Sequence, residues 1–225
     1  MNKVLIFILI SFSISKDLIL VGDSRVREIA NVLLEVEDRA YYENIRVSIQ
    51  QYYSPITTDP VPYEDFNIQV TTTQLIKHLV SGSDAVNLLH NQLKSAKPGT
   101  NVLLNIGIDD LDLLDSIIIF YGKLADKYIK LNFYVVSVIG VDETKINIEN
   151  SKVIEFNKII QNRILEVEFS NLKYKDILYN EDPTKIVLDG KPVDLFKYST
   201  DGKGFFRTGL TKIFQAFVEG LKFES

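Results

Sequence analysis

Four short segments of this chain place a hydroxyl or carboxylate side chain beside glycine. They are Gly22-Asp23-Ser24, Ser81-Gly82-Ser83, Gly107-Ile108-Asp109-Asp110 and Asp201-Gly202-Lys203-Gly204. A serine at the start of a helix can act as a nucleophile if a base lies beside it, but serine is also a preferred helix N-cap. Ser24 alone therefore does not separate catalysis from capping, and the residues that the fold brings around it must decide.

The elements expected to position these segments alternate between apolar strand-like runs and longer amphipathic helices. Strands are predicted over 18–21, 67–72, 101–106, 133–139 and 173–178, and helices over 24–36, 83–96, 111–128, 149–167 and 207–221, with irregular structure over 37–65. Strands separated by helices imply βαβ crossovers, so we expect one α/β domain with a central parallel sheet covered on both faces. Catalytic groups in such sheets gather at the carboxyl ends of the strands.

Taken in order, the four segments resemble the sequence blocks of the SGNH/GDSL hydrolases, a family of serine esterases and lipases. Gly22-Asp23-Ser24 looks like the nucleophile block, Gly82 like the oxyanion glycine, Gly107-Ile108-Asp109-Asp110 like Gly-x-Asn-Asp, and Asp201-Gly202-Lys203-Gly204 like Asp-x-x-His. The resemblance covers essentially all of residues 17–221. It implies a three-layer α/β/α fold of the flavodoxin-like type.

The resemblance also implies roles, and two positions depart from them. In the family, a serine attacks an acyl carbonyl, a histidine takes its proton, and an aspartate orients the histidine; Ser24 and Asp201 match the serine and the aspartate. The N–H groups of Ser24 and Gly82, with an asparagine amide, would hold the oxyanion. Here Gly204 stands at the histidine position and Asp109 at the asparagine position. Losing the base costs about 10⁴ to 10⁶ in rate and losing one oxyanion donor about 10². We therefore expect impaired catalysis.

Two side chains are candidate substitutes for the missing base. His78 is expected near the upper rim of the sheet, and Lys203 lies inside the final block. The other histidine, His90, lies two turns into the following helix, about 12 Å from Gly82 along its axis, so we expect a partly exposed helix residue.

The charged neighbours of the site leave further alternatives. A protonated Asp109 would donate to the oxyanion, and the neighbouring Asp110 would raise its pKa in that direction. Arg25, which follows Ser24, is expected to pair with Asp109 across the site. The acidic run of Asp109, Asp110, Asp112 and Asp115 is typical of solvated charge at a helix start, with a divalent-ion site as the alternative. We expect no metal and no cofactor.

The composition excludes several classes of protein. The 225 residues suit one domain, and a net charge of −5 with a pI near 5.2 offers no basic field to nucleic acid or to an anionic membrane. The chain has no cysteine, which excludes disulfides, zinc–thiolate sites and thiol catalysis.

The first fifteen residues are typical of a secretory signal peptide. Lys3 is followed by an apolar run over 4–12, and Ser13 and Ser15 supply small residues before a cut at Lys16. A buried first strand and a membrane anchor are the alternatives. We expect a signal peptide over 1–15, a secreted domain over 16–225, and no membrane span after cleavage.

Three functions remain open to the sequence. The first is a catalytically impaired SGNH-like protein, secreted or in the lumen of the secretory pathway, whose cleft binds a small ester, an acylated glycan or a lipid headgroup. The resemblance implies these ligands. The second is an active serine esterase or acetylesterase that uses Ser24 with a displaced base, its cleft lined by the Tyr-rich segment within 37–65. The third is a structural or interaction protein whose cleft that segment fills.

Overall fold

The computed structural model describes residues 16–33, 56–57, 61–63, 66–72 and 84–222. The predicted signal peptide, Gly82 and His78 lie outside these residues, as does most of the segment over 37–65. Within the described part, no helix is long and apolar enough to cross a membrane.

The centre of the molecule is a seven-stranded sheet in which five consecutive strands are parallel. These are β1 (Lys16–Gly22), β4 (Phe66–Thr72), β5 (Asn101–Asn105), β6 (Asn132–Val136) and β7 (Leu172–Lys175), arranged in the order β4-β1-β5-β6-β7. The short strands β2 (Ile56–Thr57) and β3 (Val61–Tyr63) pair antiparallel with β4. Among the parallel strands the second in the chain lies outside the first, which is the flavodoxin-like order.

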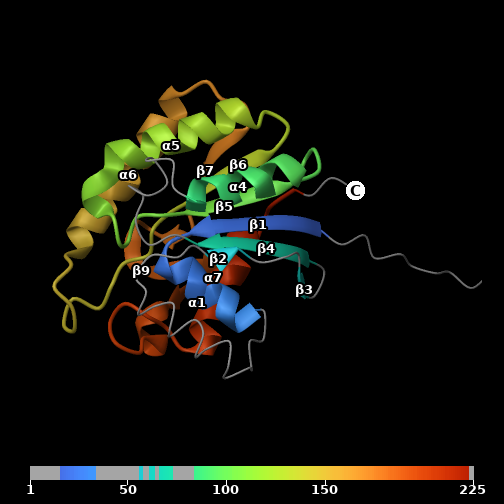
Figure 1. Ribbon diagram of the computed structural model, residues 1–225. Coiled ribbons are helices and arrows are strands. Elements are labelled where there is room, and N and C mark those ends of the chain that lie inside the picture. Colours follow the sequence, from blue (N-terminus) through green and yellow to red (C-terminus); the bar gives the residue numbers. More distant parts are fainter. Residues whose placement is uncertain (1–15, 34–55, 58–60, 64–65, 73–83, 223–225) are drawn as a thin grey trace, which may run out of the picture.

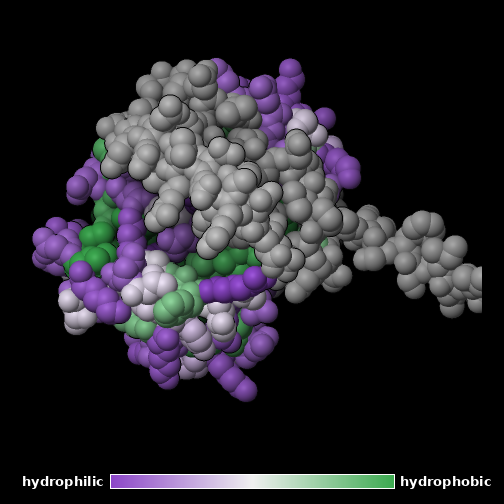
Figure 2. Space-filling model, turned by 60° about the horizontal axis from the view of Figure 1, so that its bottom comes forward, coloured by the Kyte–Doolittle hydropathy of each residue, from purple (hydrophilic) through white to green (hydrophobic). Residues whose placement is uncertain are grey.

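Helices cover both faces of the sheet (Figure 1). One layer holds α1 (Ser24–Leu33) and α7 (Arg207–Val218), and the other holds α4 (Asp84–Ser95), α5 (Leu114–Lys127) and α6 (Asn150–Glu166). Each layer closes its own hydrophobic core: Ile29 and Phe214 lie in one, and Leu89, Ile117 and Phe156 in the other. The predicted three-layer α/β/α architecture is confirmed. On the face shown in Figure 2, hydrophilic side chains surround smaller hydrophobic areas.

One part of the fold was not predicted. The chain leaves the main sheet at Lys175 and builds a second, antiparallel sheet of β8 (Leu178–Tyr179), β9 (Asp182–Leu188) and β10 (Lys191–Asp194), followed by a 3-10 helix over Leu195–Tyr198. Two-residue turns at Asn180-Glu181 and Asp189-Gly190 join the strands, all with positive φ. Asp-Gly directly after an apolar run, here Ile186 to Leu188, is a hairpin signal, so the sequence did contain a sign of this sheet.

Candidate active site

The site forms where the carboxyl ends of β1 and β5 meet. Gly22 pairs in register with Asn105, so the residues that follow the two strands emerge side by side. A Cβ atom at Gly22 would lie 2.2 Å from a methyl of Val26 and 2.4 Å from the carbonyl oxygen of Asn105. Glycine is therefore required here, because it lets the first turn of α1 close against β5 and brings Ser24 beside the segment after Asn105.

Asp23 joins the two segments. Its side chain is 1% exposed, and one carboxylate oxygen accepts from the N–H groups of Gly107 and Ile108 at 3.0 and 3.1 Å. The other oxygen accepts from the N–H of Arg25 at 3.1 Å. Burial, helped by the nearby charge of Asp109, raises the pKa of Asp23 to about 6. No separate role for Asp23 was predicted from the sequence, although its place between a strand end and a helix start puts it next to unpaired N–H groups.

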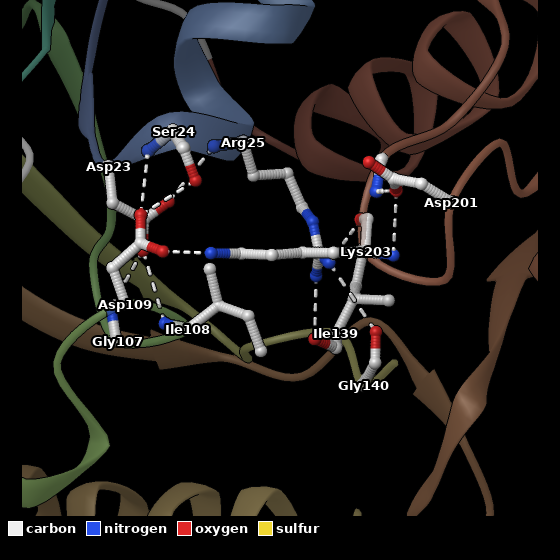
Figure 3. Close-up of polar contacts among 11 residues, drawn as sticks. Asp23, Ser24, Arg25, Gly107, Ile108, Asp109, Ile139, Gly140, Asp201 and Lys203 are labelled. Carbon is white, nitrogen blue, oxygen red and sulfur yellow. Dashed lines mark hydrogen bonds and ion pairs between the residues drawn. The ribbon is translucent and has the colours of Figure 1, made fainter. Parts of the chain in front are cut away.

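Ser24 and Asp109 are in direct contact (Figure 3). The Ser24 hydroxyl donates to Oδ2 of Asp109 at 2.6 Å, and the Ser24 backbone N–H points to the same oxygen at 3.3 Å. Burial alone would raise the pKa of Asp109, but hydrogen bonds from Lys203 and Ser24 outweigh it and hold the pKa below its usual value. Asp109 is therefore an ionised acceptor. The alternative in which it is protonated and donates is wrong.

Lys203 is the cation that neutralises Asp109. Its ammonium group forms an ion pair with Oδ1, the carboxylate oxygen that Ser24 does not use. Lys203 thus reaches the site from the loop before α7, but it contacts the partner of Ser24 instead of Ser24 itself (Figure 3). An ammonium that donates to a carboxylate has no lone pair with which to take the serine proton. A Ser–Lys base is not formed in this arrangement.

Arg25 does not pair with Asp109, so that prediction is wrong. Its side chain is 2% exposed, and its guanidinium donates to backbone carbonyls on two other loops. These acceptors are the carbonyl oxygens of Ile139 at 2.6 Å, Gly140 at 3.4 Å and Lys203 at 2.9 Å. The planar fork of an arginine can satisfy several carbonyls at once, whereas the compact ammonium of Lys203 fits a single carboxylate. Arg25 therefore holds the loop after β6 against the loop before α7.

The carboxylate of Asp201 accepts hydrogen bonds from the backbone of its own loop. Its Oδ1 accepts from the N–H groups of Gly204 at 2.7 Å and Lys203 at 3.0 Å, and these backbone bonds lower its pKa. At Gly204 a Cβ atom would lie 2.9 Å from Oγ1 of Thr200 and 3.2 Å from Oε1 of Glu28. Neighbouring side chains therefore crowd the place where the resemblance implies a histidine, and the sequence did not indicate that Glu28 or Thr200 would be among them.

The remaining candidates lie away from Ser24 or outside the described residues. His90 is a partly exposed residue of α4, as expected, and its Nδ1 lies 2.6 Å from the hydroxyl of Tyr128. Gly82 and His78 are not among the described residues, and their assignments stay predictions. In the described part of the chain, no group of three or more His, Asp or Glu side chains is arranged to hold a metal ion.

The Asp109–Lys203 pair is expected to stabilise the fold in a pH-dependent way. Lys203→Met keeps most of the side-chain stem but removes the counter-ion of the partly buried Asp109 carboxylate. This should lower the free energy of unfolding at pH 7 by on the order of 1 kcal/mol. Because the pKa of Asp109 is depressed in the folded state, the contribution is present above the ordinary aspartate pKa and is lost as the pH falls through the lowered value. Urea unfolding at neutral and acidic pH measures this difference.

Lys158→Met is the matched control, because the ion pair of Lys158 with Glu181 is mostly exposed. It should change the stability little at either pH. A loss for Lys203→Met that is as large in acid as at neutral pH would show that the stem of Lys203, and not its charge, is what stabilises the site.

The fold resembles the folds of known structures. No protein-family model matches the chain, and the comparison with curated proteins found no match either. One similar structure is a protein from Streptococcus pneumonia provisionally assigned as a platelet activating factor, with a TM-score of 0.55 and 14% identity over 94% of this chain and 84% of that one. Another is a mutant of an acetyl-xylooligosaccharide esterase from Geobacillus Stearmophilus, with a TM-score of 0.53 and 12% identity over 93% of this chain and 97% of that one.

At this level of identity the likeness concerns the fold. A central parallel sheet of five strands flanked by helices is shared with these neighbours. Because one fold can serve many functions, the function must be argued from the site.

Proposed function

We propose that this chain is a secreted SGNH-like protein in which serine-esterase chemistry is impaired and the former catalytic cleft binds an acylated carbohydrate or a lipid-type ligand. The observation that carries the proposal is the double contact between Ser24 and Oδ2 of Asp109. Oδ2 of Asp109 accepts a hydrogen bond from the Ser24 N–H, which an oxyanion would need as a donor. The same oxygen also accepts a hydrogen bond from the Ser24 hydroxyl.

The chemistry of the site agrees with loss of acyl transfer. An oxyanion forming beside the ionised Asp109 would be repelled, whereas an asparagine amide there would attract it. Asp109 has a lowered pKa, which makes it a weak base toward a serine hydroxyl. In the described residues the site therefore has neither a competent base nor a free oxyanion donor at Ser24.

The same groups suit a ligand rich in hydroxyl groups. Ser24, Asp109 and Lys203 present a hydroxyl, a carboxylate and an ammonium group next to one another, and all three are only partly buried. A sugar hydroxyl can donate to the carboxylate and accept from the ammonium at once. One structural neighbour is described as an esterase of acetyl-xylooligosaccharides, which makes an acetylated oligosaccharide the first ligand to test.

The impairment is tested by the hydrolysis of an activated acetate ester by the purified full chain, beside Ser24→Ala. We expect the two proteins to release product at the same rate, equal to that of buffer alone. Turnover well above that of Ser24→Ala would overturn the proposal and establish an esterase. His78→Ala would then show whether this residue supplies the base.

Ligand binding is tested by calorimetry with acetylated xylooligosaccharides. We expect saturable binding that Lys203→Met weakens, while Lys173→Met, a change at an exposed lysine on β7, leaves it unaltered. Absence of binding to acetylated and deacetylated oligosaccharides alike would remove the carbohydrate part of the proposal.

A further inference from the structure

A hollow of about 310 Å³ lies at the opposite edge of the sheet from Ser24. It opens where α4 and α5 end, beside the amino ends of β5 and β6. Figure 1 shows how these helix ends lie relative to the strands. One wall is the end of α4 with the turn after it, and the other is the turn between α5 and β6. The lining residues are Leu93, Lys94, Ala96, Pro98, Lys127, Tyr128, Ile129, Lys130 and Leu131.

Hydrogen bonds hold the two walls together. The N–H of Gly99 donates to the carbonyl of Lys130 at 2.7 Å, and the side-chain amide of Asn132 donates to the carbonyl of Gly99 at 3.0 Å. The hydroxyl of Tyr128 contacts His90 of α4 at 2.6 Å. The hollow is therefore preformed by the fold and lies at the lower end of the size range of small-molecule sites, roughly 300–1,000 Å³.

The lining combines apolar side chains with positive charge. Lys94, Lys127 and Lys130 are exposed, no acidic residue lines the hollow, and none of the three lysines forms an ion pair with a carboxylate of the described residues. Ile129 is 74% exposed between two of these lysines. The chain as a whole carries a net charge of −5, so this local excess of positive charge is opposite in sign to the average surface.

We propose that this hollow binds a monomeric anionic amphiphile, an alkyl chain that ends in a carboxylate such as a fatty acid. The apolar floor would take the alkyl chain, and the three ammonium groups on the rim would pair with the anionic head. A preformed hollow fits one alkyl chain better than it fits the flat surface of a membrane. The three lysines favour an anionic headgroup over a neutral or cationic one.

The experiment is a calorimetric titration of the full chain with decanoate below its micellar concentration. We expect saturable binding at one site, weakened at least about 10-fold by Lys94→Glu/Lys130→Glu because two attractive charges become repulsive. Octanoate should bind roughly 10-fold more weakly than decanoate, since two fewer methylenes are buried. Lys152→Glu/Lys191→Glu, at exposed lysines outside the hollow, changes the charge equally and should leave the affinity within about 2-fold.

Three results would overturn this proposal. They are the absence of saturable binding, equal weakening by the two charge-reversed pairs, and binding to phosphatidylserine vesicles without binding to decanoate, which would indicate a bilayer-docking surface instead. Ser24→Ala should bind decanoate as the parent chain does, because Ser24 lies at the other edge of the sheet. The outcome is therefore separate from that of the esterase test.

Discussion

Asp23→Ala is expected to lower the free energy of unfolding by about 3 to 6 kcal/mol, because three buried N–H groups would lose their acceptor at once. Gly107, Ile108 and Arg25 donate these bonds, and Asp23 is 1% exposed, so water would not replace the carboxylate readily. For a chain of this size such a loss corresponds to a fall in Tm of roughly 10 °C or more. Thermal unfolding followed by circular dichroism measures it.

Asp23→Asn is the control that separates hydrogen bonding from charge. An asparagine keeps one acceptor for Gly107 and Ile108 but turns an amide toward the N–H of Arg25, so we expect a smaller loss than for alanine. Equal losses in the two variants would contradict this account and point to the charge of Asp23 as the stabilising feature.

The carboxyl group of Asp23 also sets a pH dependence. Its pKa in the folded protein is about 6, above the ordinary value, so the folded state binds a proton that the unfolded state has already released. The contribution of Asp23 to stability is then largest below the ordinary aspartate pKa and falls as the pH rises through about 6. Asp23→Asn should lack this part of the pH profile, which urea unfolding between pH 4 and 7 would show.

Introducing the catalytic groups of the SGNH hydrolases at this site is expected to create esterase activity. The variant Asp109→Asn/Thr200→Ala/Gly204→His should hydrolyse an activated acetate ester at least about 10²-fold faster than the parent chain. A general base and an oxyanion donor together contribute a much larger rate acceleration than this in serine hydrolases. Thr200→Ala removes the hydroxyl that would lie 2.9 Å from the new Cβ atom. Lys203 needs an acceptor and should turn the asparagine oxygen toward itself, which leaves the amide to face Ser24.

Full family-level activity is not expected, because Asp201 is bound to the N–H groups of its own loop and would orient the new histidine poorly. The gained rate should fall as the pH drops below about 6.5, where a histidine base becomes protonated. Adding Ser24→Ala should abolish it, and Asp109→Asn alone should gain little because no base is present. A folded triple variant without activity would show that the site has lost more than these groups.

The order of elements and the location of the site followed from local patterns in the sequence. Apolar runs of strand length and helical periodicity predicted the parallel sheet, and segments such as Gly22-Asp23-Ser24 and Gly107-Ile108-Asp109-Asp110 placed chemistry at strand ends. These signals lie within a few residues of one another, so they do not depend on the rest of the fold. The difference between Gly204 and the histidine that the SGNH pattern has at this place was likewise visible in one short segment.

The pairing of charged side chains was decided by the tertiary structure. Asp109 lies 94 residues from Lys203 in the chain, and whether Lys203 or Arg25 meets it depends on which loop crosses the strand ends and where each cation finds acceptors. Arg25 is next to Ser24 in the sequence yet turns to the carbonyls of two distant loops. The same holds for Lys94, which only the packing of α4 against the end of α5 brings to Lys127 and Lys130. Contacts of this kind arise from strand order and helix packing, and no pattern of neighbouring residues records them.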